Sequence, residues 1–257
     1  MDDIIYLLSH YWESFLQGLA GTIVISILGT FIGLCLGTLL AFGKNMKVRK
    51  KSSLAGKITA RVVSFCCSAY SLILRGTPMM VQAIIFKYGC QSLGLNWTYI
   101  LIDQPVFNGW FFAGTIVISL NTGAYMCEIV RSGLNGIDHG EIDGARSLGM
   151  SRAQANLRIA LPTALRNQIP TIGNEWIVNI KDSSVLNVIS VTELYLATDE
   201  IANSSYRLMA SYIILAAIYL ILTLLTSLIL RIVERKMDRK PVFTWPAFHF
   251  REKKGAQ

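Results

Sequence analysis

The sequence predicts an all-α membrane protein with five transmembrane helices, built as one domain over residues 1–257. Hydrophobic residues make up 53% of the chain and charged residues only 16%, against about 25% in soluble domains. The apolar residues come in long blocks with almost no charge, as expected where a helix needs roughly 20 apolar residues to cross a bilayer. Lysines and arginines gather between these blocks, which is typical of loops on the cytoplasmic side.

The first predicted span, residues 14–43, contains no charged residue. Gly29, Gly33 and Gly37 recur at intervals of four residues and therefore lie on one face of a helix. Small residues in this pattern favour close helix packing in membranes. The partner of this face is either another helix of the same chain or a second subunit.

The second predicted span, residues 58–90, is interrupted. Its apolar part 62–74 makes a helix only about 20 Å long, so we expect neither this piece nor the shorter 79–86 to cross alone. Gly76 and Pro78 lie between the two pieces, where helical hydrogen bonding is weakened. We predict one broken span whose first part lies partly along the cytoplasmic interface.

Three further spans are predicted at residues 109–129, 169–189 and 208–230. A polar connection precedes the fourth span, and an acidic loop, 191–206, follows it. The fourth span is the least apolar, because it contains Glu175, Lys181 and Asp182.

The basic residues predict the orientation. Six lie in 44–57, five in 131–166 and eight in the tail 231–257, and the N-terminal segment before the first span has none. All three segments fall on the cytoplasmic side if the N-terminus is outside and the C-terminus inside. Net charge is +8, but juxtamembrane charge of this kind contacts anionic lipid of the bilayer rather than nucleic acid.

The loop between spans three and four, residues 138–166, is called the coupling loop below. Residues 142–149 read as a short amphipathic helix, with Gly149 as its turn. A second helix, 152–160, is expected to end near Pro162. Two helices of this size cannot cross a membrane, but they are suited to a groove on a soluble partner.

This loop resembles that of the permease subunits of bacterial ATP-binding-cassette importers. Their pattern is Glu-Ala-Ala, three residues, Gly, nine residues, Ile-x-Leu-Pro. The present chain has Asp143-Gly144-Ala145, three residues, Gly149, nine residues, then Ile159-Ala160-Leu161-Pro162. The resemblance implies contact with an ATPase subunit through Asp143, Gly144, Ala145, Arg146, Gly149, Leu161 and Pro162.

The resemblance narrows to the branch that imports polar amino acids such as histidine, arginine and glutamine. It is carried by Arg75-Gly76-Thr77-Pro78, by 124–131, and by Asn174-Glu175 leading to Lys181-Asp182-Ser183-Ser184. It covers about residues 14–235. It implies a bacterial cytoplasmic (inner) membrane, an ATPase subunit that holds ATP and Mg, an extracytoplasmic substrate-binding protein, and a second copy of this chain or a homologous permease. No cofactor is expected in this chain itself.

Polar and ionisable groups within spans are the candidates for the substrate path, because such groups usually face an aqueous path or a bundle interior. They could meet the ammonium and carboxylate groups of an amino acid. Internal ion pairs and interhelical hydrogen bonds are the alternative reading, with Glu128 and Arg131 as one such pair and Arg75 as an anchor beside the broken helix. The candidates are Glu175, Lys181, Asn174, Ser183, Asp182, Glu128 and Asn121.

The sequence argues against an enzyme. Gly43-Lys44 and Gly56-Lys57 lack the upstream glycine and the following Ser or Thr of a phosphate-binding loop. No metal-ligand spacing is evident. Two other classes remain open, namely a structural or sensory membrane subunit and a secondary transporter, although the latter predicts inverted repeats, which are not evident here.

Overall fold

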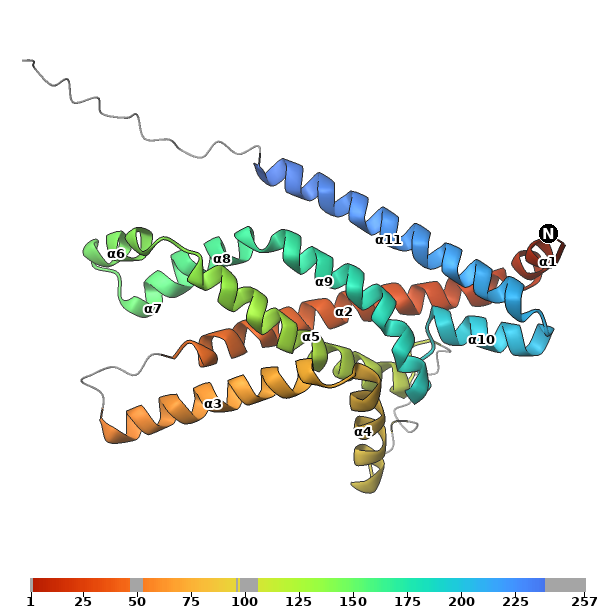
Figure 1. The fold of residues 1–257 in the computed structure, drawn as a ribbon, viewed down its shortest axis with the longest axis horizontal. Coiled ribbons are helices and arrows are strands. Elements are labelled where there is room, and N and C mark those ends of the chain that lie inside the picture. Colours follow the sequence, from red (N-terminus) through yellow and green to blue (C-terminus); the bar gives the residue numbers. More distant parts are fainter. Residues whose placement is uncertain (1, 47–52, 96, 98–105, 239–257) are drawn as a thin grey trace, which may run out of the picture.

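The computed structural model describes residues 2–46, 53–95, 97 and 106–238, and all regular elements in this part of the chain are helices. Four helices are long and apolar enough to cross a membrane. They are α2 (Trp12–Lys44), α3 (Leu54–Gly76), α5 (Gly109–Asn135) and residues Leu208–Met237 of α11 (Leu208–Asp238) (Figure 1). The predicted spans 14–43, 109–129 and 208–230 each fall within one of these helices.

The glycine stripe of α2 packs against α5 of the same chain. A Cβ on Gly29 would lie 2.7 Å from Ile118, and one on Gly33 would lie 2.8 Å from Thr122. On Gly37 it would lie 2.5 Å from Cβ of Met126. The absence of side chains therefore lets the two backbones approach. Of the two partners that the sequence left open, the glycine face of α2 packs against a helix of the same chain.

The predicted break in the second span is confirmed at residues 76–78. The helix α3 ends at Gly76, α4 (Met79–Ser92) begins after Pro78, and the two run in clearly different directions (Figure 1). The Gln82 side chain joins the two pieces, because its Nε2 lies 2.8 Å from the Leu74 carbonyl and 2.9 Å from that of Thr77.

The expected shortness of the first piece does not hold for α3, which is long and apolar enough to cross a membrane. This helix has 23 residues, or about 34 Å, which exceeds the ~30 Å of hydrocarbon. It is longer than its apolar stretch because the Ser53 side chain caps it by accepting a hydrogen bond from the Gly56 amide. Hydropathy alone could not show that the helix continues through its less apolar first turns.

The predicted fourth span, 169–189, is divided. It consists of α9 (Ile169–Asp182) and a 3-10 helix, η3 (Ser183–Ile189). With 14 residues, α9 is about 21 Å long and does not reach across a bilayer alone. The turn at Gln168 separates it from α8 (Leu161–Asn167), because Pro170 in its first turn has no N–H to continue the preceding helix.

Two predicted connections have more helix than expected. The acidic loop 191–206 is largely a helix, α10 (Leu194–Ser205). In the coupling loop, α6 (His139–Ser147) and α7 (Arg152–Ala155) are followed by a π-helical turn, Asn156–Ala160, and directly by α8. The expectation that the second helix ends near Pro162 is wrong, because helical turns continue without a gap through Pro162, which lies in the first turn of α8.

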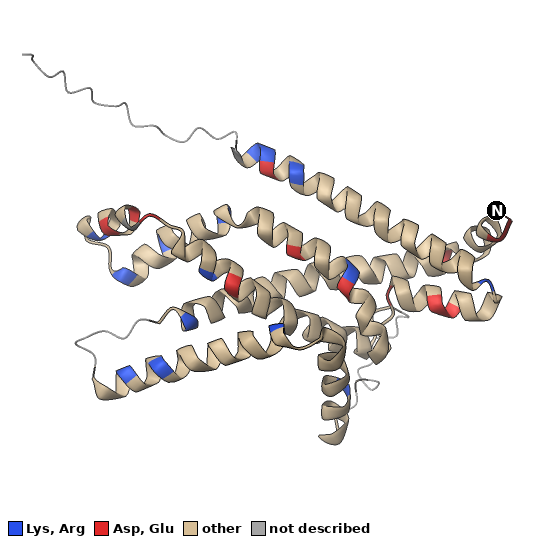
Figure 2. Cartoon of the chain, viewed as in Figure 1, with Lys and Arg blue, Asp and Glu red and all other residues tan. Residues whose placement is uncertain are grey.

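The basic loops meet at one end of the molecule. The end of α2, the start of α3, the coupling loop and the end of α11 lie together there, and α1 (Asp2–His10) and α10 lie at the other end (Figure 1). Figure 2 shows most of the lysine and arginine positions toward the first end. The fold thus brings together charges that are far apart in the sequence.

Candidate functional site

A carboxylate on α5 gathers three cationic side chains near the basic end of the bundle. Glu128, whose side chain is 19% exposed, forms ion pairs with Lys44 of α2, with Arg75 of α3 at 3.8 Å, and with Arg131 at 2.8 Å. The Ser71 hydroxyl donates to Oε1 of Glu128 at 3.1 Å. This set is called the Glu128 cluster. It confirms the expected Glu128–Arg131 pair and extends it to three helices.

The Glu128 cluster holds α3, whose interface with the bundle has few apolar groups. Only Ala60 and Ser71 of α3 are buried. The Tyr70 hydroxyl donates to the Leu120 carbonyl at 2.7 Å, and the Arg75 guanidinium lies 5.4 Å from the centre of the Tyr125 ring. Arg75 is thus tied to α5 twice, in agreement with the anchoring role considered from the sequence.

A row of polar side chains joins the helices closer to the middle of the bundle. The Asn121 amide donates to Oε1 of Gln82 at 2.9 Å, linking α5 to α4. Thr122 donates to the Asn179 side chain at 3.0 Å, and Asn179 donates to Thr30 at 2.8 Å. Asn121, a candidate for the path, is 8% exposed, and the contacts it makes here are interhelical hydrogen bonds.

The candidate residues of α9, unlike Asn121, include exposed and half-buried ionisable groups. The helix is unbroken from Ile169 to Asp182, so Glu175 and Lys181, six residues apart, point to different sides, whereas Glu175 and Asp182 share a face. Asn174 and Lys181 are exposed, and Glu175 and Asp182 are half-buried. Among the described residues none of the three ionisable groups has an ion-pair partner.

Ser183 is buried at the end of α9, and its hydroxyl donates to the Ile180 carbonyl at 2.9 Å. The structure therefore shows this candidate bonded within its own helical turn. It does not bring Ser183 together with the Glu128 cluster, which lies on a different group of helices.

Sequence reasoning missed Glu193, a fully buried carboxylate between η3 and α10. It caps α10 by accepting hydrogen bonds from the backbone amides of Tyr195 and Leu196 at 2.9 and 2.8 Å, and it accepts a third from the Tyr219 hydroxyl at 2.9 Å. Burial raises the pKa of this carboxyl, and these hydrogen bonds oppose that shift. Glutamate is not a preferred N-cap residue, so the sequence held little signal for this role.

The coupling loop is exposed and has well-defined turns. Gly149 has φ of +91°, a conformation that favours glycine, which confirms the predicted turn. Ser151 and Gln154 form a reciprocal capping box that starts α7. Asp143 is 73% exposed and lies 3.7 Å from Arg146, and nothing lies within 4 Å of a Cβ built on Gly144.

Other predicted coupling residues face the bundle. Ala145 is buried, and Leu161 packs against the buried cluster of Ala41, Cys127 and Val130. The loop therefore has an exposed face on α6 and an apolar attachment to the spans.

Four candidate spans, polar and charged groups between them, and an exposed helical loop at one end define the class of a membrane-spanning transport subunit. The family model described as "Binding-protein-dependent transport system inner membrane component" matches residues 52–239. The chain belongs to this family. It is a non-catalytic permease subunit, and ATP is hydrolysed by a separate subunit of such systems.

Named relatives are similar over most of their length. The glutamine transport system permease protein GlnP of Escherichia coli K12 is 34% identical over 86% of this chain and 92% of its own. The arginine transport system permease protein ArtQ of Bacillus subtilis is 33% identical over 86% and 91%.

Solved structures show the same fold. The crystal structure of an amino acid ABC transporter with histidines contains a chain that is 33% identical with a TM-score of 0.71, covering 89% of this chain and 96% of that one. A chain of the MetNI methionine transporter, only 18% identical, has a TM-score of 0.62. The latter likeness concerns the fold alone.

Proposed function

We propose that this chain is the channel-forming subunit of an importer that moves a polar amino acid across the bacterial cytoplasmic membrane. The observation that carries this is similarity over 86% of the chain to permeases of glutamine and arginine transport systems. The exposed coupling loop supports it, because a permease needs a surface through which its ATPase can act. ATP and Mg belong to that ATPase, and no cofactor is proposed for this chain.

The proposed topology has five spans, with the N-terminus outside and the C-terminus inside. The fourth span, predicted at residues 169–189, is formed by α9 and η3, and α8 leads into it from the coupling loop. The gathering of lysine and arginine at the end with the coupling loop supports this orientation (Figure 2). An ATPase would dock at that end, and a substrate-binding protein at the end with α1 and α10.

The substrate path is proposed to run along α9. Asn174 and Lys181 are exposed there, and Glu175 and Asp182 are half-buried. Charged groups without ion-pair partners are expensive in a bilayer, so we place them beside water and substrate where this chain meets a second copy or a homologous permease. Ser183, Asn121 and the Glu128 cluster then support the walls of the path.

Reconstitution tests this function directly. The permease is inserted into vesicles with its ATPase and binding protein, and uptake of labelled amino acids is measured with and without ATP. The expected result is ATP-dependent uptake together with ATP hydrolysis that substrate-loaded binding protein stimulates. Uptake driven by an ion gradient alone would indicate a secondary transporter, and the absence of both uptake and stimulated hydrolysis would indicate a structural or sensory subunit.

A further inference from the structure

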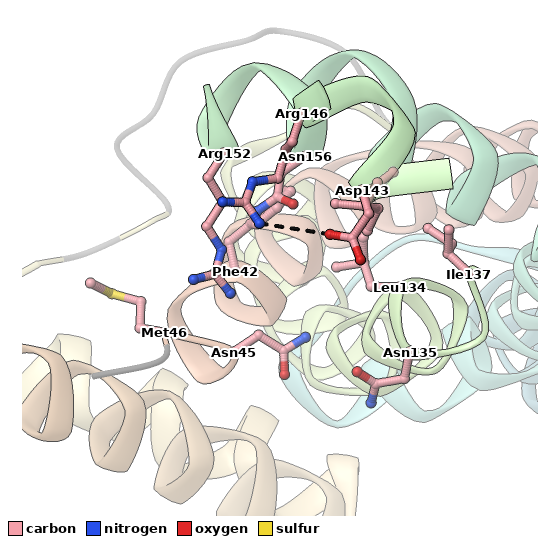
Figure 3. A pocket seen from close by; sticks show the side chains of 12 residues that line it. Phe42, Asn45, Met46, Leu134, Asn135, Ile137, Asp143, Arg146, Arg152 and Asn156 are labelled. Carbon is pink, nitrogen blue, oxygen red and sulfur yellow. Dashed lines mark ion pairs between the residues drawn. The ribbon is translucent and has the colours of Figure 1, made fainter. Parts of the chain in front are cut away.

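A groove of about 900 Å³ lies between the coupling loop and the ends of α2 and α5 (Figure 3). Its apolar lining includes Phe42 of α2, Leu134 of α5 and Ile142 of α6. Its volume falls at the upper end of the roughly 300–1,000 Å³ of small-molecule sites. It is separate from the proposed path along α9 and from the Glu128 cluster, since it contains no residue of either.

The polar side of this groove is rich in positive charge. Arg146 and Arg152 both extend from the coupling loop toward the end of α2 (Figure 3). Asp143 lies 3.7 Å from Arg146, but the two side chains are 73% and 55% exposed, so this pair is weak. Arg152 has no ion pair among the described residues. The groove therefore favours an anion with a group that two guanidinium groups can share.

Under the proposed orientation, the groove lies at the cytoplasmic end of the uncharged stretch of α2. The uncharged stretch of α2 ends at Gly43 and the first cation follows at Lys44, so Phe42 belongs to its last apolar turn. α2 has 33 residues, about 50 Å, and so extends beyond the ~30 Å of hydrocarbon. An anion with an apolar part that is available beside the inner face of a membrane is a phospholipid.

We infer that this groove binds an anionic phospholipid of the inner leaflet. Arg146 and Arg152 hold its phosphate, and Phe42, Leu134 and Ile142 contact the glycerol and the first acyl carbons. The assignment to the inner leaflet rests on the proposed function, through the orientation of the coupling loop. A lipid in this place connects α6 and α7 to the end of α2, so anionic lipid steadies the coupling loop and raises coupled transport.

The chain's own C-terminal segment is a poor competitor for this site. Residues 239–257 contain five lysines and arginines and one acidic residue, so they carry the same sign of charge as the two arginines. An acidic segment of the ATPase would satisfy the charge but not the apolar lining of Phe42, Leu134 and Ile142. This alternative is separated from the lipid in the experiment below.

Lipid binding is tested on the complete transporter, with its ATPase and binding protein, purified in detergent. Native mass spectrometry follows bound phosphatidylglycerol and phosphatidylcholine for the wild type and for the double variant Arg146→Gln/Arg152→Gln. The matched control is Arg158→Gln, an exposed arginine of the same loop that does not line the groove. We expect the double variant alone to lose about tenfold in phosphatidylglycerol affinity, as for the loss of charge-assisted hydrogen bonds to phosphate.

A functional arm uses vesicles of phosphatidylcholine with or without phosphatidylglycerol. Phosphatidylglycerol should stimulate coupled transport by the wild type and by Arg158→Gln several-fold more than transport by the double variant. Inorganic phosphate is added at constant ionic strength as the free-anion probe. If inorganic phosphate competes with phosphatidylglycerol on equal terms, the groove is a site for soluble anions and the lipid proposal is wrong.

The remaining outcomes are decisive as well. Loss of the ATPase from the purified double variant would assign the arginines to subunit docking, and unchanged phosphatidylglycerol binding would also overturn the proposal. If the wild type shows no transport but the variants differ in lipid binding, the proposed function fails and the lipid site stands. Both arginines are exposed, so the double variant should fold, and Arg152→Gln alone should give an intermediate loss.

Discussion

Glu128 shows how one residue can hold several helices. Its two carboxylate oxygens contact Lys44, Arg75 and Arg131, which come from α2, α3 and α5. Three cations placed close together repel one another unless a carboxylate lies between them. Removal of Glu128 therefore costs more than the loss of any single ion pair, because it leaves three neighbouring cations without a carboxylate between them.

Replacing this carboxylate should loosen α3. We expect Glu128→Gln to lower the free energy of unfolding by about 1–3 kcal/mol, somewhat less than the roughly 3–5 kcal/mol for breaking a fully buried pair. Thermal unfolding of the purified permease followed by tryptophan fluorescence measures this. Glu141→Gln on exposed α6 is the control, and an equal melting temperature in both variants would show that the Glu128 cluster contributes nothing to stability.

The ionisable residues of α9 allow a second prediction at this scale. Glu175→Gln and Lys181→Met should each lower substrate-stimulated ATP hydrolysis at least about tenfold, as when a charged hydrogen bond to substrate is lost. The ATPase should still co-purify in normal yield, since neither side chain has an ion-pair partner among the described residues. If the variants instead assemble poorly, but the complex that does form has full activity, both residues have a structural role.

At the scale of elements, the chain uses glycine in two opposite ways. On α2 it removes side chains so that helices can approach, and after α6 it supplies a backbone conformation that other residues resist. The surroundings of each glycine distinguish the two uses. A Cβ on Gly37 would collide with α5, whereas one on Gly149 would meet open space but sit at φ of +91°.

The packing role predicts a contrast between two alanine variants. Gly37→Ala should destabilise the permease by about 1–3 kcal/mol, the usual range for overpacking, because the new Cβ would lie 2.7 Å from the Cys127 backbone nitrogen. Gly89→Ala in α4 has nothing within 4 Å and should be neutral or stabilise by up to about 1 kcal/mol. Denaturation curves compare them, and equal stability would refute the packing role.

The turn at Gly149 predicts an effect on coupling instead. Gly149→Val should add about 1–3 kcal/mol of backbone strain, and either this change or Asp143→Lys should weaken ATPase pull-down or uncouple hydrolysis from transport. The spans should still insert, because both positions lie on the exposed coupling loop. Gly144→Ala, with open space around it, is the matched control. Normal binding and coupled transport in the Val and Lys variants would remove this loop from the mechanism.

At the scale of the whole molecule, the two ends differ in charge. The end with the coupling loop has most of the arginine and lysine together with some acidic residues, whereas the α1 and α10 end has mainly acidic residues (Figure 2). This difference is the physical basis for the proposed orientation, since positive segments stay on the cytoplasmic side during insertion.

Cysteine labelling in intact cells checks the orientation. In a variant without its native cysteines, Ser204→Cys on α10 should react with an impermeant thiol reagent added outside, and Ala55→Cys at the start of α3 should not. Both positions are exposed, so accessibility depends on the side of the membrane. Labelling of Ala55→Cys alone would reverse the topology.

Features that depend on neighbouring residues could be predicted from the amino-acid order alone. Long uncharged runs predicted α2, α5 and α11, and Pro78 with Gly76 predicted the break between α3 and α4. The spacing around Gly149 predicted both its turn and the family. Each is local, because hydrophobicity, helix termination and backbone conformation are set within a few residues.

Contacts between groups far apart in the chain depend on how the helices pack in three dimensions. Lys44 and Glu128 are 84 residues apart and Thr22 and Glu193 are 171 apart, and no local pattern marks these pairs. The sequence alone did not indicate which helix packs against Gly29, Gly33 and Gly37, and the structure shows that it is α5. The division of 169–189 into α9 and η3 also escaped prediction, because packing of neighbouring helices overrides the average hydropathy from which spans are predicted.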